Sequence, residues 1–154
     1  MADELIAVQS NTARTWNAKR NAYGYGYKVT RFVTGSNGHN PSNPRLPIAP
    51  DPERAGCYCG SDAITTADGC LFSDFIDEVV FTTPYCPVYV CVLESGESIG
   101  VVSSICLIAE ITCSPIPDDP LIGTEFLYAT VNMPYRPKIA GETIRYEIYV
   151  PTKL

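Results

Sequence analysis

The sequence is poor in histidine and in positive charge, and both shortages argue against large functional classes. His39 is the only imidazole, and the Gly, Asn and Pro residues around it are typical of a solvent-facing turn, not of a Ser–His–Asp site. The 11 Lys and Arg residues are outnumbered by 17 Asp and Glu, so the formal net charge is −6. Nucleic-acid binding needs clustered Lys and Arg to neutralise phosphates, and we therefore expect no nucleic-acid partner.

Long apolar runs are also absent. Ser, Glu or Pro interrupts each apolar stretch well before the ~20 residues of a membrane-spanning helix, so no membrane partner is expected. The first residues, MADELIAVQS, carry acids where a signal peptide has a basic region and an apolar core. These features predict a soluble protein made in the cytoplasm.

Recognisable enzyme chemistry is missing as well. The GSNG stretch at residues 35–38 lacks the Gly-Lys-Ser/Thr ending of a phosphate-binding loop and runs into prolines. The acidic pairs Asp77 with Glu78 and Asp118 with Asp119 are expected to be solvated, because adjacent strand residues point to opposite faces and the second pair lies in a proline-rich turn. We predict no catalytic residue, no metal, no cofactor and no enzymatic activity.

The sequence instead contains repeated strand signals separated by Pro- and Gly-bearing turns. Residues 98–113 alternate between apolar and polar positions, and residues 87–94 are apolar on both faces, as in a central strand covered on both sides. The last strand signal places apolar residues at every second position: Ile144, Tyr146, Ile148 and Val150. The predicted fold is mainly β, an antiparallel β-sandwich or barrel that forms a single domain over residues 1–154.

A short helix is predicted near the N-terminus, at residues 9–23 within a helical segment of residues 1–24. Trp16 is its only large anchor, and such a short helix is expected to pack on the sheet or on a neighbouring chain. The pattern then changes to a strand with four apolar residues predicted on one face: Tyr25, Tyr27, Val29 and Val33.

A proline-rich arm at residues 36–60 follows that strand. Prolines fix φ, so the arm is expected to be stiff and extended, and their spacing of three residues suits a polyproline II run with unpaired backbone groups. Isolated apolar residues on such an arm would gain from a partner groove, so we predict an assembly element. Its residues are Pro41, Pro44, Leu46, Pro47, Ile48, Pro50 and Pro52. A plain surface loop is the alternative.

Seven cysteines lie in the middle of the chain: Cys57, Cys59, Cys70, Cys86, Cys91, Cys106 and Cys113. Buried reduced thiols are one interpretation, and we expect it for Cys91, Cys106 and Cys113, which have apolar neighbours. Zinc would need four ligands, and the C-x-C pair with one distant cysteine falls short of that set. We predict at least one disulfide that involves Cys57, Cys59 or Cys70, in a segment expected to be exposed, forming after release from the cell.

Two stretches have a recognisable order of elements. In YKVTRFVTGSNGHNPSNPRLPIAPDP a strand runs into a glycine turn and then a proline series. In SSICLIAEITCSPIPDDPLIGTEFLYATVNMPYRPKIAGETIRYEIYV a G-x-x-F-L-Y-A strand is followed by a proline-bearing turn and a last strand. Both stretches resemble the virion proteins of tailed phages, of the tail-fibre and tail-collar type. The similarity covers most of the chain outside residues 1–24 and 60–95, and its motifs are structural.

The resemblance implies a structural virion component, an attachment or adaptor protein of the tail, neck, collar or baseplate. Its expected location is the virion, after synthesis in the host cytoplasm, and its expected partners are copies of itself and other virion proteins. The alternative is a carbohydrate- or protein-binding β module, because ten tyrosines and Trp16 offer stacking surfaces. For Tyr23, Tyr25 and Tyr27, packing in the core is the preferred interpretation.

Overall fold

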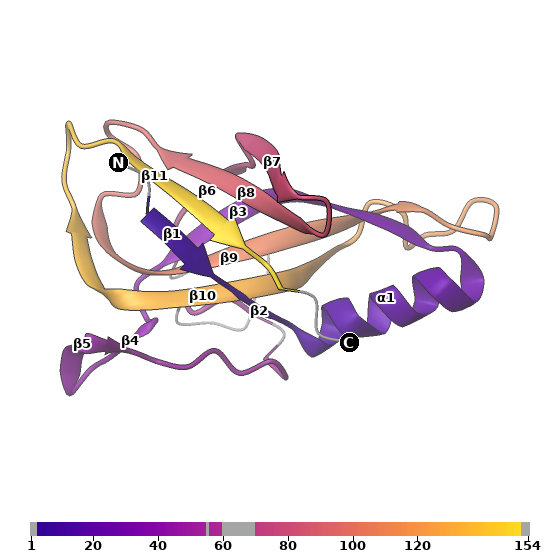
Figure 1. The fold of residues 1–154 in the computed structure, drawn as a ribbon, viewed down its shortest axis with the longest axis horizontal. Coiled ribbons are helices and arrows are strands. Elements are labelled where there is room, and N and C mark those ends of the chain that lie inside the picture. The colour runs from indigo at the N-terminus through magenta and orange to yellow at the C-terminus, as the bar shows by residue number, and fades with distance from the viewer. Residues whose placement is uncertain (1–2, 55, 60–69, 152–154) are drawn as a thin grey trace.

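Two β-sheets pack together in the computed structural model, which describes residues 3–54, 56–59 and 70–151 (Figure 1). The four-stranded sheet consists, in spatial order, of β1 (Asp3–Ile6), β11 (Ile144–Tyr149), β8 (Cys86–Leu93) and β7 (Glu78–Thr83). The five-stranded sheet consists of β2 (Val8–Gln9), β10 (Glu125–Lys138), β9 (Gly100–Cys113), β3 (Gly26–Gly35) and β6 (Cys70–Phe75). The predicted sandwich is confirmed, and the barrel alternative is wrong because the described strands leave both sheets open.

Strand pairing is antiparallel except between β1 and β11, which run parallel. The chain passes from one sheet to the other at Ala7, whose N–H donates to the Tyr149 carbonyl at 2.8 Å. β1 therefore extends one sheet and β2, one residue later, extends the other. This crossing ties the two layers together at one edge.

The main core fills the space between the two sheets. Alternate residues of β9 and β11 enter it, as the sequence predicts: Ile105, Leu107, Ala109, Ile111, Ile144, Tyr146 and Ile148. β8 lies between β11 and β7, and its consecutive residues Val90 and Cys91 are both fully buried, which confirms a central strand covered on both faces.

A bulge in β3 changes which of its side chains reach the core. The register with β9 shifts between Val29 and Arg31, so that one extra residue reverses the alternation. Val29 and Phe32 therefore pack in the main core, whereas Val33 lies on the opposite face. The prediction that Val33 shares a face with Val29 is wrong for this reason.

The opposite face of the five-stranded sheet carries a second, smaller core cluster. Residues 56–59 lie over this face, so the middle of β9 is buried on both sides. The cluster consists of Val33, Cys57, Cys59, Cys106, Ile108 and Leu127.

The predicted helix is confirmed as α1 (Asn11–Tyr23), but the helical segment predicted over residues 1–24 is wrong before it, because β1 and β2 there pair with β11 and β10. The Ser10 hydroxyl accepts the N–H of Ala13 at 3.0 Å and donates to the Leu127 carbonyl at 2.5 Å, so the cap also attaches the helix to β10. Gly24 ends the helix in the left-handed conformation, with φ of 88°. No helix among the described residues is long and apolar enough to cross a membrane.

The arm contains a small hairpin of β4 (His39–Asn40) and β5 (Asn43–Pro47). It lies at the end of the molecule away from α1 (Figure 1). The prediction of an unpaired polyproline II run is wrong here, because Asn40 pairs with Asn43 and His39 with Pro47. β5 has no other described partner, and an edge strand tolerates prolines that lack an N–H.

Candidate functional site

The five-stranded sheet has an open strand edge where β6, the outermost strand beside β3, ends. β6 pairs with β3 only from Arg31 to Gly35, after which the Ile76 N–H donates to the Thr30 carbonyl at 3.0 Å. The chain then crosses to the other sheet as β7. No described strand covers this edge of β3 from Gly26 to Val29, and such an edge is a template for a strand from another chain.

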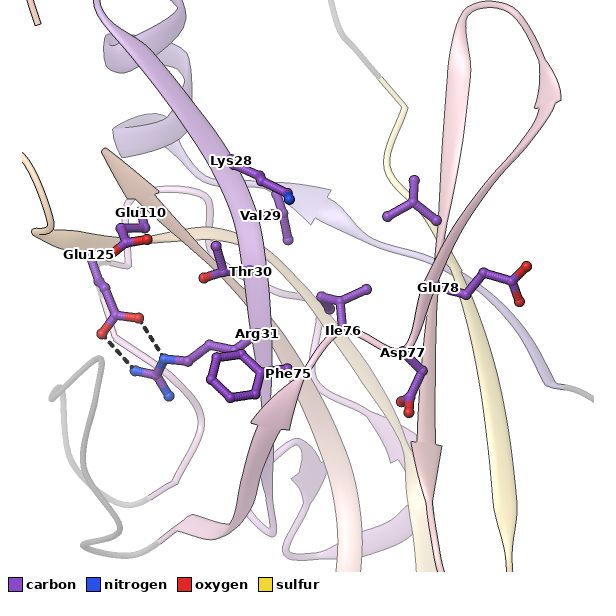
Figure 2. Close-up of a pocket in the computed structure, with 11 residues that line it drawn as sticks. Lys28, Val29, Thr30, Arg31, Phe75, Ile76, Asp77, Glu78, Glu110 and Glu125 are labelled. Carbon is purple, nitrogen blue, oxygen red and sulfur yellow. Dashed lines mark hydrogen bonds and ion pairs between the residues drawn. The ribbon is translucent and has the colours of Figure 1, made fainter. Parts of the chain in front are cut away.

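A groove of about 460 Å³ lies beside this edge, between β3 and β7 (Figure 2). We call it the edge groove. Its lining residues are Lys28, Val29, Thr30, Arg31, Phe75, Ile76, Asp77, Glu78, Val79, Glu110 and Glu125.

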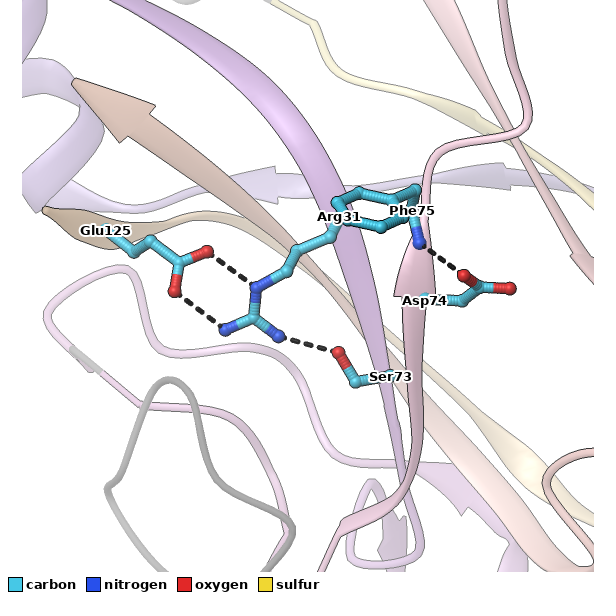
Figure 3. Close-up of polar contacts among 5 residues, drawn as sticks. All are labelled: Arg31, Ser73, Asp74, Phe75 and Glu125. Carbon is cyan, nitrogen blue, oxygen red and sulfur yellow. Dashed lines mark hydrogen bonds and ion pairs between the residues drawn. The ribbon is translucent and has the colours of Figure 1, made fainter. Parts of the chain in front are cut away.

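One wall of the edge groove is fixed by a charged pair (Figure 3). Arg31 Nε lies 2.6 Å from Glu125 Oε2, and its Nη2 lies 3.0 Å from Oε1, which is a bidentate geometry. Arg31 Nη1 also donates to Ser73 Oγ at 2.6 Å. Because Arg31 and Glu125 are partly shielded from solvent, with side chains 14% and 24% exposed, this pair holds β3, β6 and β10 in register at the groove.

The remaining charges make the edge groove acidic. The strand register places the positive charge of Lys28 on β3 opposite the negative charge of Glu110 on β9. Asp77 and Glu78 are exposed, as predicted; Asp77 accepts the Val92 N–H at 2.8 Å, and Glu78 lies 3.7 Å from Arg145. The lining thus contains four carboxylates and two basic groups.

Beside the groove, β7 exposes apolar side chains on its core-facing side. Val79 lies opposite Tyr89 and Phe81 opposite Pro87 on β8, and Tyr89 packs against the main core. Cross-strand partners share a face, so Val79 and Phe81 lie on the side of β7 that faces the main core. They lie beyond the edge of the five-stranded sheet. Four exposed apolar residues on and beside this strand form what we call the β7 patch: Phe75 at the end of β6 (74% exposed), Val79 (43%) and Phe81 (63%) on β7, and Tyr85 in the turn after it (87%).

The predicted arm residues do not line the edge groove. Most of them are exposed and Leu46 is 53% exposed, whereas Ile48 and Pro50 are half-buried. The arm is fixed at two points beyond its hairpin: Asn132 Nδ2 donates to the Ile48 carbonyl at 2.9 Å, and the Asn11 N–H donates to the Pro52 carbonyl at 2.6 Å. The arm and the edge groove are therefore separate surfaces.

His39 lies at the base of this hairpin and is half-buried, so the prediction of a solvent-facing turn is wrong. Its Nδ1 lies 2.9 Å from Ser103 Oγ, which also accepts the Gly38 N–H at 2.9 Å. Its ring packs edge-on against Tyr135, with ring centroids 5.4 Å apart. Because Ser103 is fully buried beneath the hairpin, this Ser–His contact positions the arm and does not expose a nucleophile.

Trp16, the predicted helix anchor, packs on its own chain. Its ring stacks on Phe126 with centroids 5.9 Å apart and meets Tyr25 edge-on at 5.3 Å. Tyr25 and Tyr27 pack against the main core, as preferred from the sequence, but Tyr23 is 66% exposed. Burial, followed by the neighbouring Tyr128, raises the pKa of Tyr27 to about 12.

The cysteine predictions have mixed outcomes. Cys91 and Cys106 are buried, as expected, but Cys113, the last residue of β9, is exposed, so its predicted burial is wrong. The exposure predicted for Cys57 and Cys59 is also wrong, because residues 56–59 cover the five-stranded sheet. The side chain of Cys70 lies outside the described residues, so a disulfide that involves it stays a prediction. Within the described part of the chain, no group of three or more His, Cys, Asp or Glu is placed to hold a metal ion.

The sequence interpretation missed the edge groove and the β7 patch. The one available signal was the stretch FIDEVVFTTPY at residues 75–85, whose apolar residues are too few and too interrupted for a central strand. No family model, curated protein or solved structure matches the chain.

Proposed function

We propose that the chain is a structural assembly protein, a component of a tailed-phage virion that acts as an attachment or adaptor protein of the tail, neck, collar or baseplate. The location within a virion rests on the sequence resemblance of the strand and turn segments. The assembly role rests on the core-facing side of β7, which carries exposed apolar residues beside an open strand edge.

The energetic argument concerns the side chains of the β7 patch. Burying a large apolar side chain contributes about 1.5–3 kcal/mol, so a partner that covers Phe75, Val79 and Phe81 gains several kcal/mol of association free energy. The free edge of β3 offers backbone hydrogen bonds beside these side chains, which is the combination that β-strand addition uses. A strand from a second copy or from another virion protein is the occupant that fits.

The arm is the second proposed contact. Its hairpin projects with Leu46 exposed, while its base is fixed by the contacts of Gly38, Ile48 and Pro52. A pre-ordered element loses less entropy on binding than a flexible loop, so the hairpin suits docking on a neighbour.

The test compares the mass of the assembled protein in solution for three forms of the chain. Light scattering over a concentration series is expected to show oligomers of the natural chain, or complexes when virion proteins are added. A variant with Phe75→Ser and Phe81→Ser is expected to remain monomeric with an unchanged thermal unfolding midpoint.

Ile139→Ser is the matched control, because Ile139 is 65% exposed in the turn after β10 and lies outside the β7 patch. It is expected to assemble like the natural chain. Assembly of the Phe75→Ser/Phe81→Ser variant at natural affinity would contradict the assigned surface, and a natural chain that stays monomeric with every virion protein would contradict the function.

A carbohydrate- or protein-binding module is the second candidate, and one observation favours it. A hollow of about 560 Å³ lies between α1 and the start of the β9–β10 loop, with the exposed ring of Tyr23 on its rim. Aromatic rings of this kind stack on sugars. Glycan binding by the monomer, abolished by Tyr23→Ala and unaffected by the change at Phe75 and Phe81, would favour this candidate.

A further inference from the structure

Cys57 and Cys106 lie together in the small core cluster on the face of the five-stranded sheet that residues 56–59 cover. Cys106 is in the middle of β9, where the register pairs it with Val33 on β3 and Thr130 on β10. Cys57 comes from the covering segment, and the two residues are 0% and 1% exposed. Their thiol groups share a hydrogen bond.

The surroundings of the two sulfur atoms differ. The hydrogen bond to Cys106, together with burial, raises the pKa of the Cys57 thiol. Burial opposes ionisation of Cys106, but hydrogen bonds from Cys57, the Tyr58 backbone and Thr130 outweigh it and lower the pKa of the Cys106 thiol. Thr130 Oγ1 lies 3.8 Å and Ser104 Oγ 4.0 Å from the Cys106 sulfur.

Cys59, two residues after Cys57, faces a different part of the sheet. Its Sγ lies 3.0 Å from the position that a Cβ on Gly35 would occupy and 3.8 Å from the Thr34 carbonyl oxygen. The register places the backbone of Cys70 opposite Gly35. The fold thus separates the C-x-C pair, with Cys57 at Cys106 and Cys59 toward the β3–β6 edge.

We propose that Cys57 and Cys106 are a built-in disulfide site that locks the arm-bearing segment onto β9 under oxidising conditions. The oxidant is a small disulfide such as oxidised glutathione. Cys57 exchanges with it to give a mixed disulfide and one glutathione thiol. The Cys106 thiolate then attacks Cys57 Sγ, the new S–S bond forms, and a second glutathione thiol leaves.

The consequence is a fixed arm. One end of the arm continues from β3, which is held in the sheet, and the other end passes into residues 56–59, which pack in the small core cluster. The bond joins that second end to the central strand, so both ends of the hairpin segment are held. Closing the chain between residues 57 and 106 also restricts the unfolded state, so oxidation is expected to raise the thermal unfolding midpoint.

Peptide mapping of the full chain tests the proposal. The reduced protein is treated with excess oxidised glutathione, residual thiols are alkylated, and the protein is digested without reductant. Trypsin is unsuitable, because the chain has no Lys or Arg between Arg54 and Arg136. A protease that cleaves after acidic residues releases Cys106 alone in residues 98–110 and Cys57 with Cys59 in residues 54–62; further cleavage after Tyr58 separates those two.

The expected product is a peptide that joins Cys57 to Cys106, with a rise in the unfolding midpoint that Cys106→Ser removes and Cys113→Ser, at an exposed position, retains. The peptide map of the natural chain tests the proposal even if a serine variant folds poorly. Cys106 fully alkylated after oxidation, Cys106 linked to Cys59 instead, or zinc bound to the purified chain and protecting both thiols from alkylation would each overturn it.

Discussion

The side chain of Asp119 holds the loop between β9 and β10 in place through three hydrogen bonds. Its carboxylate accepts hydrogen bonds from Ser114 Oγ at 2.6 Å, the Leu121 N–H at 2.9 Å and the Tyr25 hydroxyl at 3.1 Å. These bonds, that from Ser114 first, hold the pKa of Asp119 below its ordinary value. The prediction of a solvated pair is right for exposed Asp118 and wrong for Asp119, because the partners of Asp119 are brought together only by the turn and by a residue distant in sequence.

Asp119→Asn is expected to lower the thermal unfolding midpoint near neutral pH, because the hydroxyls bond one carboxylate oxygen and the Leu121 N–H the other, and an amide has only one acceptor oxygen. A depressed folded-state pKa gives stability that is present above the unfolded value of about 4 and is lost as the pH falls through the folded value. The difference between natural chain and variant should therefore shrink toward acid pH. Thermal unfolding followed by circular dichroism from pH 7 downward measures it.

Asp118→Asn is the control, since Asp118 is exposed and already left-handed, with φ of 55°, a conformation that Asn tolerates. Its effect should be small at every pH. If the unfolding midpoints of the natural chain and of Asp119→Asn differed by the same amount at acid pH, the variant would act through packing and not through the charged carboxylate.

At the scale of elements, the alternation of apolar and polar residues predicted β9, β11 and α1 well, because each depends on local periodicity. It failed in β3, where one bulged residue reversed the faces, and in the arm, where proline spacing predicted a polyproline II run but the chain forms the β4–β5 hairpin. Both features depend on contacts with other elements. The hairpin is placed by a buried hydrogen bond to Ser103 and a partly buried one to Asn132, which no local pattern encodes.

Gly38 provides a test of that placement. A Cβ on Gly38 would lie 2.1 Å from the Ser103 carbonyl oxygen and 2.7 Å from Asn132 Oδ1, so Gly38→Ala must displace the base of the hairpin. We expect a loss of about 1–3 kcal/mol in the free energy of unfolding, measured by urea denaturation. Asn37→Ala, one residue earlier with an exposed side chain, should change it little. Equal stability of the two variants would show that the space at Gly38 is not required.

At the scale of the molecule, the sequence predicted a mainly β sandwich but not the open edge of β3. The edge groove exists because β6 stops at Phe75 and the chain moves to the other sheet, so that β7 extends past the edge left by β3. Strand order and strand length are set by pairing between distant segments. Neither follows from the alternation within one segment, so the β7 patch became visible only with both sheets in place.

Lys28 offers a direct test of the central claim, that this chain assembles into a particle through the edge groove. It is exposed and lines the groove, so an amine-reactive cross-linker can report what lies there. The measurement is cross-linking mass spectrometry on phage particles purified from lysed cultures of the host that produces the chain. We predict that the chain is present in a fixed ratio to other particle proteins, with Lys28 linked to a second copy or to another particle protein. Absence of the chain from purified particles, or its presence with Lys28 linked only within its own chain, would contradict the account.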